Sequence, residues 1–133
     1  MLSIYEDYLP MPKSLSMEEM HSLHEEIVEE IGKDEEAQEL YDELIATATR
    51  YLTFRANWCL WNKEEKMERD SARTSCHDSV IVKLNMLERF LKMKGKDVRW
   101  REVLGHEEND PSFRKRIGDF ACYIVFINSL LAR

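Results

Sequence analysis

Glycine and proline are scarce in this sequence, which has four glycines and three prolines among its 133 residues. Neither residue occurs between Gly32 and Gly95. A β-sheet needs a tight turn about every ten residues, and such turns favour glycine and proline. A stretch of this length without them excludes most sheet architectures and favours helices.

Cysteine is also sparse. The three residues of this type, Cys59, Cys76 and Cys122, are an odd number and include no Cys-x-x-Cys pair. This pattern excludes a disulfide framework and a zinc knuckle. We therefore expect buried, reduced thiols.

Long apolar runs are absent as well. The longest one, Phe120–Leu131, is interrupted by Asn128 and Ser129 and is shorter than the roughly 20 residues that cross a bilayer. Residues 1–14 have neither a basic leader nor an apolar run, so they do not resemble a signal peptide. The sequence thus predicts a cytoplasmic protein with no membrane partner.

The net charge of −7 is unevenly distributed. Residues 18–43 hold twelve acids against Lys33, a net of −11, whereas residues 44–133 carry a net of +5. Either the two parts complement each other within the chain, or the acidic surface meets a basic protein partner. Duplex nucleic acid is disfavoured as the main ligand, because binding it requires clustered Lys and Arg.

Apolar residues recur at helical spacing through most of the chain. We predict an all-α protein, an antiparallel bundle of four main helices plus one short helix, in a single domain over residues 1–133 with an extended arm at residues 1–15. Capping residues such as Ser16 with Glu19, and Asp34, mark helix starts, and glycines mark ends. The expected helices are residues 17–31, 35 toward Cys59 and beyond, 76–94, 98–104 and 111 almost to the C-terminus.

The end of the second helix is the least defined boundary. An unbroken helix over residues 35–94 would be about 90 Å long, too long for a compact domain. We predict a tight turn near Asp70 and Ser71, with Ser75 and Asp78 as alternative caps for the next helix.

The last predicted helix is apolar on all sides. It is either the centre of the bundle or is covered by a second copy of the chain, which would make the protein a homodimer. On that surface Phe126 and Leu130 are candidate interface residues. Trp100 and Arg101 form a second candidate interface on the short helix, unless Trp100 roofs the end of the core.

One charged series is the best candidate for a ligand site. Glu65, Arg69, Arg73 and His77 follow one another at intervals of four, so a continuous helix would align them on one face, whereas a turn near residue 70 would crowd them at the tip of a helical hairpin. Either arrangement places the cluster near Trp58 and Trp61. Such a cluster could bind a phosphate or carboxylate through its arginines. The alternative is a ladder of structural ion pairs.

The sequence contains few residues placed to bind a metal or a cofactor. His21 and His24 stand three residues apart, but no third ligand follows by spacing, and His24 also fits a packed position on the apolar stripe. No phosphate-binding glycine loop or nucleophile elbow is present. We predict no metal, no cofactor and no catalytic residue.

Two families of all-helical enzymes match in part. Glu26-x-x-Glu29 and Glu39-x-x-Asp42 resemble the magnesium-binding pairs of MazG-type nucleotide pyrophosphohydrolases, but only nine residues separate them. Arg101 and His106 have the spacing used by HEPN ribonucleases, although Gly105 places them in a helix-ending turn. A metal-dependent nucleotide hydrolase or a HEPN-like ribonuclease is therefore the alternative function.

The C-terminal half contains three sequence segments that resemble those of a known family. Its segments RTSCHD from Arg73, WREVLG from Trp100 and RKRIGDF from Arg114 resemble a small bacterial helical family of unknown function. The resemblance implies nothing about activity. The leading hypothesis is a non-catalytic protein-interaction or regulatory module.

Overall fold

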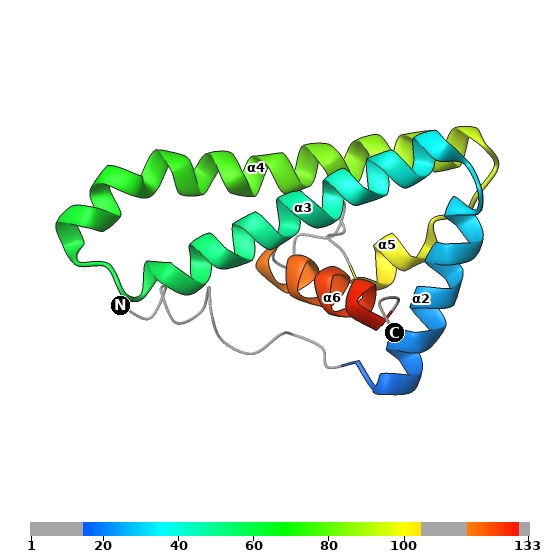
Figure 1. Cartoon of the computed structure of the whole chain (residues 1–133), viewed down its shortest axis with the longest axis horizontal. Helices are drawn as coiled ribbons and strands as arrows, with labels where there is room; N and C mark the ends of the chain where they lie inside the picture. The colour runs from blue at the N-terminus through cyan, green and yellow to red at the C-terminus, as the bar shows by residue number, and fades with distance from the viewer. Residues whose placement is uncertain (1–14, 105–116, 131–133) are drawn as a thin grey trace.

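The computed structural model describes residues 15–104 and 117–130, and their regular structure is helical (Figure 1). The all-α prediction is confirmed. The predicted arm at residues 1–15, apart from Leu15, and the predicted helix start at Asp110 and Pro111 lie outside the described residues. The helices are α2 (Met17–Ile31), α3 (Glu35–Trp58), α4 (Lys63–Met93), α5 (Arg99–Leu104) and α6 (Ile117–Ser129).

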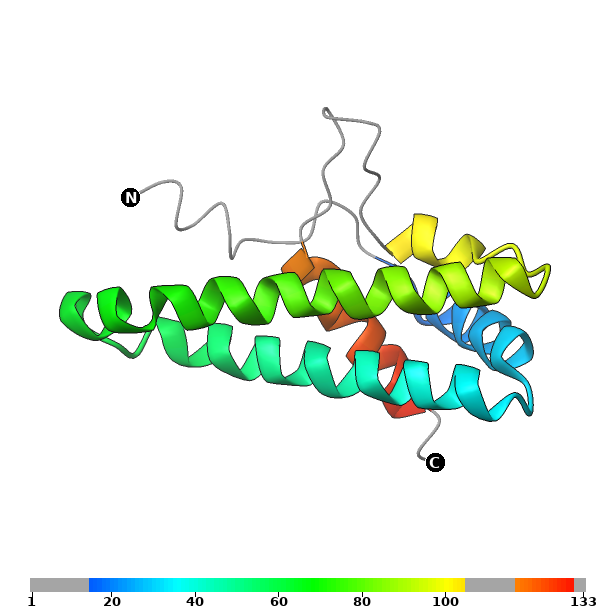
Figure 2. The same ribbon diagram turned by 90° about the horizontal axis from the view of Figure 1, so that it is seen from above.

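Helices α3 and α4 form one long antiparallel hairpin, and among the described helices this pair has the most extensive contact (Figure 1). Helix α2 stands steeply across one end of the hairpin, and α6 crosses it against α3 (Figures 1 and 2). The regular antiparallel bundle of four main helices is thus not confirmed. One part of the hairpin carries the other helices, and the rest projects beyond them.

Helix α2 begins and ends where the sequence places it. Ser16 and Glu19 form a reciprocal cap, in which each side chain accepts a hydrogen bond from the other residue's backbone N–H at 3.1 Å. Gly32 ends the helix with φ of 54°, in the left-handed region that favours glycine. Asp34 then caps α3 by accepting from the N–H groups of Glu36 and Ala37.

The predicted turn near Asp70 and Ser71 is wrong. Both residues, and the alternative caps Ser75 and Asp78, lie inside α4, which runs unbroken from Lys63 to Met93. The chain reverses at residues 59–62 instead, because Asn62 and Glu65 cap α4 reciprocally, at 2.8 and 3.0 Å. This is the Asn-x-x-Glu form of the pattern that starts α2, and it needs neither glycine nor proline.

The core lies in one half of the hairpin. Each helix of the described chain contributes buried side chains, and the last on α3 is Tyr51 while the first on α4 is Val80. None of residues 52–79, all of which are described, is buried. The largest fully buried side chains are Trp100, Tyr51, Phe120, Leu23, Ile27, Leu44, Leu84, Leu87, Leu91, Leu104, Ile124 and Ile127.

Helix α6 is buried on one side rather than all round. Phe120, Ile124 and Ile127 have no exposed surface, whereas Phe126 is 44% exposed and Leu130 is half-buried.

None of the described helices combines the length and the apolar character needed to cross a membrane. Among the cysteines, Cys76 and Cys122 are half-buried, but Cys59 is exposed, contrary to the expected burial.

Two carboxylates of α2 hold α5: Glu26 pairs with Arg99, and Glu30 makes the more buried contacts. Glu30 accepts hydrogen bonds from the backbone N–H of Val98 at 2.9 Å and from the indole Nε1–H of the buried Trp100 at 2.8 Å. Val98 has φ of 54°, which a β-branched residue adopts only under strain. The bond to Glu30 and the burial of the Val98 side chain offset that strain.

Replacing Glu30 with Ala should lower the free energy of unfolding by about 2 to 3 kcal/mol, because two donors in the protein interior lose their acceptor. Urea denaturation measures this loss. The control is Glu29→Ala, an exposed neighbour on the same helix, which should change stability by less than about 0.5 kcal/mol. Equal effects of the two substitutions would contradict the role assigned to Glu30.

Candidate functional site

The four residues of the charged series lie along the face of α4 that turns toward α3. Continuity of α4 from Lys63 aligns Glu65, Arg69, Arg73 and His77 in one row, as their spacing predicts for an unbroken helix. The row runs beside the last turns of α3, which carry Phe54 and Trp58. The sequence therefore identified the neighbours correctly, although it placed the turn elsewhere.

Both arginines of the row stack on tryptophan rings. The guanidinium carbon of Arg69 lies 4.5 Å from the ring centre of Trp61, and that of Arg73 lies 5.2 Å from the ring centre of Trp58. Phe54 packs edge-on against Trp61, with ring centres 5.2 Å apart, and the ring centres of Trp58 and Trp61 are 6.0 Å apart. We call these five residues, Phe54, Trp58, Trp61, Arg69 and Arg73, the aromatic–arginine tip.

Carboxylates flank the same arginines. Arg73 pairs with Asp70 at 3.0 Å, and Arg69 lies 3.8 Å from Glu65. These exposed pairs are worth little in water, about 0 to 1 kcal/mol each. Stacking on a ring adds comparable energy and, more importantly, fixes the plane of the guanidinium group.

His77 ends the row at the edge of the core. Its ring packs edge-on against Tyr51, with centres 5.8 Å apart, and its Nδ1 lies 3.1 Å from Asp78. His77 therefore packs at the boundary between α3, which carries Tyr51, and its own helix α4, which carries Asp78.

The end of the hairpin also exposes an apolar side chain beside these rings. Leu60, which precedes Trp61 in the turn, is 79% exposed. Tryptophan and arginine are the residue types that most often dominate the energy of protein interfaces. The tip therefore has the composition of a contact surface, presented on a projecting arm (Figure 1).

Comparison with family models, curated proteins and solved structures found no match to this chain. The resemblance of residues 73–133 to a small bacterial helical family stays a prediction. The side chains of the tip are planar cations stacked on aromatic rings, and an exposed apolar side chain lies next to them.

The candidate interface on α5 faces inward. Trp100 has no exposed surface, and it roofs the end of the core. Arg101 donates to Glu88 at 2.8 Å and to Asn85 at 3.2 Å, which fixes α5 on α4. His106, its proposed partner in a ribonuclease site, lies outside the described residues.

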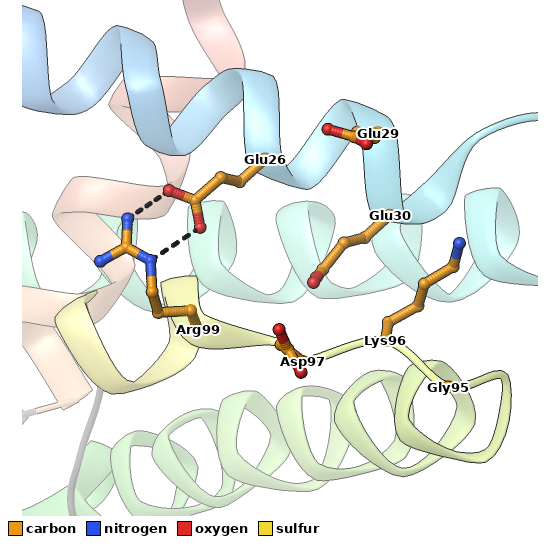
Figure 3. Close-up of a pocket in the computed structure, with 7 residues that line it drawn as sticks. All are labelled: Glu26, Glu29, Glu30, Gly95, Lys96, Asp97 and Arg99. Carbon is orange, nitrogen blue, oxygen red and sulfur yellow. Dashed lines mark hydrogen bonds and ion pairs between the residues drawn. The ribbon is translucent and has the colours of Figure 1, made fainter.

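A hollow of about 320 Å³ separates α2 from the segment that leads into α5 (Figure 3). Glu26, one of the acids matched to the magnesium-binding pairs, is used there in an ion pair with Arg99. Glu29 and Lys96 also line the hollow, but Glu39 and Asp42 do not. The described residues contain no group of three or more His, Cys, Asp and Glu side chains placed to share a metal ion.

His24 lies on α2, where burial of its ring lowers its pKa and the nearby His21 lowers the pKa further. Its Nε2 is buried and bonds to no described residue. Because the folded protein binds this proton less readily than the unfolded chain, the contribution of His24 to stability is lost as pH falls below about 6.5.

We therefore expect the urea midpoint to fall between pH 7.5 and pH 5.5 by more in the wild-type protein than in His24→Gln. His21→Gln should lie between the two, since it removes only the repulsive cause. A pH dependence unchanged in His24→Gln would contradict this assignment.

Proposed function

We propose that this chain is a non-catalytic protein-interaction module whose partner binds the aromatic–arginine tip. The observation that carries the proposal is the absence of any buried residue over residues 52–79, in a segment that nevertheless concentrates three large rings and two stacked arginines. Covering apolar rings that are partly exposed to water lowers the free energy of the system. A partner would supply that cover.

The geometry of the arginines favours binding without much reorganisation. Each guanidinium group is already held on a ring, so less side-chain freedom is lost when it pairs with a partner's carboxylate. Residues 50–77 include six Lys or Arg and four Asp or Glu, a net charge of +2. The partner that fits best is therefore a protein segment with acidic and apolar residues.

The acidic surface of residues 18–43 is a less suitable contact. Several of its carboxylates have partners within the chain: Asp34 lies 3.8 Å from Lys94, and Glu43 lies 3.2 Å from Lys83. These pairs, with Glu26 and Arg99, satisfy part of the charge locally. The arginines of the tip also have carboxylate neighbours, but they stack on partly exposed rings, whereas the one Phe, Tyr or Trp among residues 18–43, Tyr41, is buried. The tip thus replaces this surface as the proposed binding region.

The enzyme alternatives gain no supporting contact. Glu26 is paired with Arg99 and Arg101 with Glu88, and among the described residues Glu26, Glu39 and Asp42 do not form a group that could hold a metal ion. A regulatory role and a cytoplasmic location remain predictions that the interaction proposal accommodates.

The test uses the tagged full chain as bait in the native cell, with chemical cross-linking before purification. Wild-type protein should retain at least one reproducible partner, and Arg69→Glu should reduce its recovery about tenfold, because one stacked cation is replaced by a repelling charge. Arg50→Glu makes the same charge change at an exposed position of α3 outside the tip and should leave recovery unchanged.

Circular dichroism verifies that each variant folds. Recovery of the same partner with Arg69→Glu, or loss with Arg50→Glu, would show that the tip is not the contact. Failure of the wild-type chain to retain any partner would contradict the interaction module itself.

A further inference from the structure

The two arginines of the aromatic–arginine tip differ in their contacts with carboxylates. Arg73 donates to one carboxylate oxygen of Asp70, from Nη2 at 3.0 Å and from Nε at 3.3 Å. Among the described residues, the carboxylate that approaches Arg69 is that of Glu65, at 3.8 Å, which is beyond hydrogen-bond distance. One guanidinium group is therefore bonded to an acceptor within the described chain, and the other is not.

The carboxylate of Glu65 is held in place by the start of α4. Its Oε1 accepts a hydrogen bond from the backbone N–H of Asn62 at 3.0 Å, as part of the reciprocal cap. The side chain of Arg69 is 40% exposed, and its Nη1 is buried without a hydrogen-bond partner in the described part of the chain. The exposed remainder of this guanidinium group is open to a ligand's carboxylate.

The carboxylate of Asp70 has a different position. Asp70 lies inside α4, away from its caps, and its one ion pair among the described residues is with Arg73. The pair is three residues apart, so both side chains lie on the same side of the helix. The face of the same guanidinium group lies on the ring of Trp58. Asp70 thus occupies one edge of Arg73, while the ring supports its face.

These contacts give the two arginines unequal value to a partner with acidic residues. A carboxylate that reaches Arg69 forms charge-assisted hydrogen bonds that no described residue already makes. A carboxylate that reaches the occupied edge of Arg73 must displace Asp70, so one such bond is exchanged for another and Asp70 is left unpaired. The gain in binding is therefore larger at Arg69.

We infer that Asp70 is a specificity-determining residue of the tip, which competes with the partner for Arg73 and so directs the partner's carboxylate to Arg69. This inference rests on the proposed function and deepens it. The partner that it selects is an apolar segment with one acidic residue placed for Arg69. A run of acids finds Arg73 occupied, and the carboxylate of Asp70 beside it repels further negative charge.

Acetate measures this competition, because it supplies a free carboxylate. Nitrogen-15 NMR resolves the Nε–H group of each arginine, and the variants Arg69→Lys and Arg73→Lys identify the two signals. In the wild-type chain, acetate should shift the Arg69 signal about threefold more than the Arg73 signal, with sodium chloride as the ionic-strength reference. In Asp70→Asn the Arg73 shift should rise about threefold, because its occupied edge becomes open.

Glu68→Gln is the matched control. It removes one negative charge from an exposed position of α4, two residues before Asp70, where the described residues show no ion pair with either arginine. Its Arg73 signal should respond to acetate as in the wild-type chain. Equal shifts of the two arginines in the wild-type chain, or an Arg73 response unchanged by Asp70→Asn, would overturn the inference. So would an equal gain in Glu68→Gln, because general repulsion would then explain the effect.

Failure of this inference and failure of the proposed function are distinguishable. A wild-type bait that retains no partner contradicts the interaction module, whereas the acetate shifts depend on the arginines and Asp70 alone. In the same purification, Asp70→Asn should retain additional acidic proteins that neither the wild-type chain nor Glu68→Gln retains. An Asp70→Asn bait that retains only the wild-type partners would overturn the selection assigned to Asp70.

Discussion

The reversal of the chain at residues 59–62 is the constraint on which the rest of the structure depends. Asn62 and Glu65 satisfy each other's backbone N–H and so fix the first turn of α4. From that start the helix runs without interruption to Met93, and its rotation is set for every later residue. The same phase directs Arg69 and Arg73 toward α3 and directs Val82 and Met86 away from it.

The position of the core follows from the length that this turn gives the hairpin. Helices α2, α5 and α6 contact only part of α3 and α4, and the buried residues stop at Tyr51 and Val80 (Figure 1). Beyond them the two helices are held by surface rings, stacked arginines and weak ion pairs. Segments with few buried contacts open locally at lower free energy than the core, and binding surfaces are often drawn from them.

Much of the fold follows from the sequence because its signals are local. The caps at Ser16 and Asp34 and the stop at Gly32 bound α2 and start α3 as predicted. The reciprocal cap at Asn62 has the same form, but the polar stretch that follows it concealed the continuous helix.

The contacts that the sequence could not reveal are those between distant residues. Glu30 and Trp100 are seventy positions apart, and only the packing of α5 on α2 brings them together. Tryptophan is a residue type that is common in interfaces, so the sequence made Trp100 an interface candidate, but the fold buries it in the core. The stacking of Arg69 on Trp61 similarly required the register of α4 against the turn, which spacing alone does not give.

Native-state hydrogen exchange, resolved by residue along α4, tests the division of the hairpin most directly. Amides within residues 80–91 should exchange only through global unfolding, whereas those within 67–79 should exchange through a local opening of lower free energy. The change should fall within about a turn of Val80. Equal protection along the whole of α4 would mean that the outer half is as stable as the core, and would contradict this account.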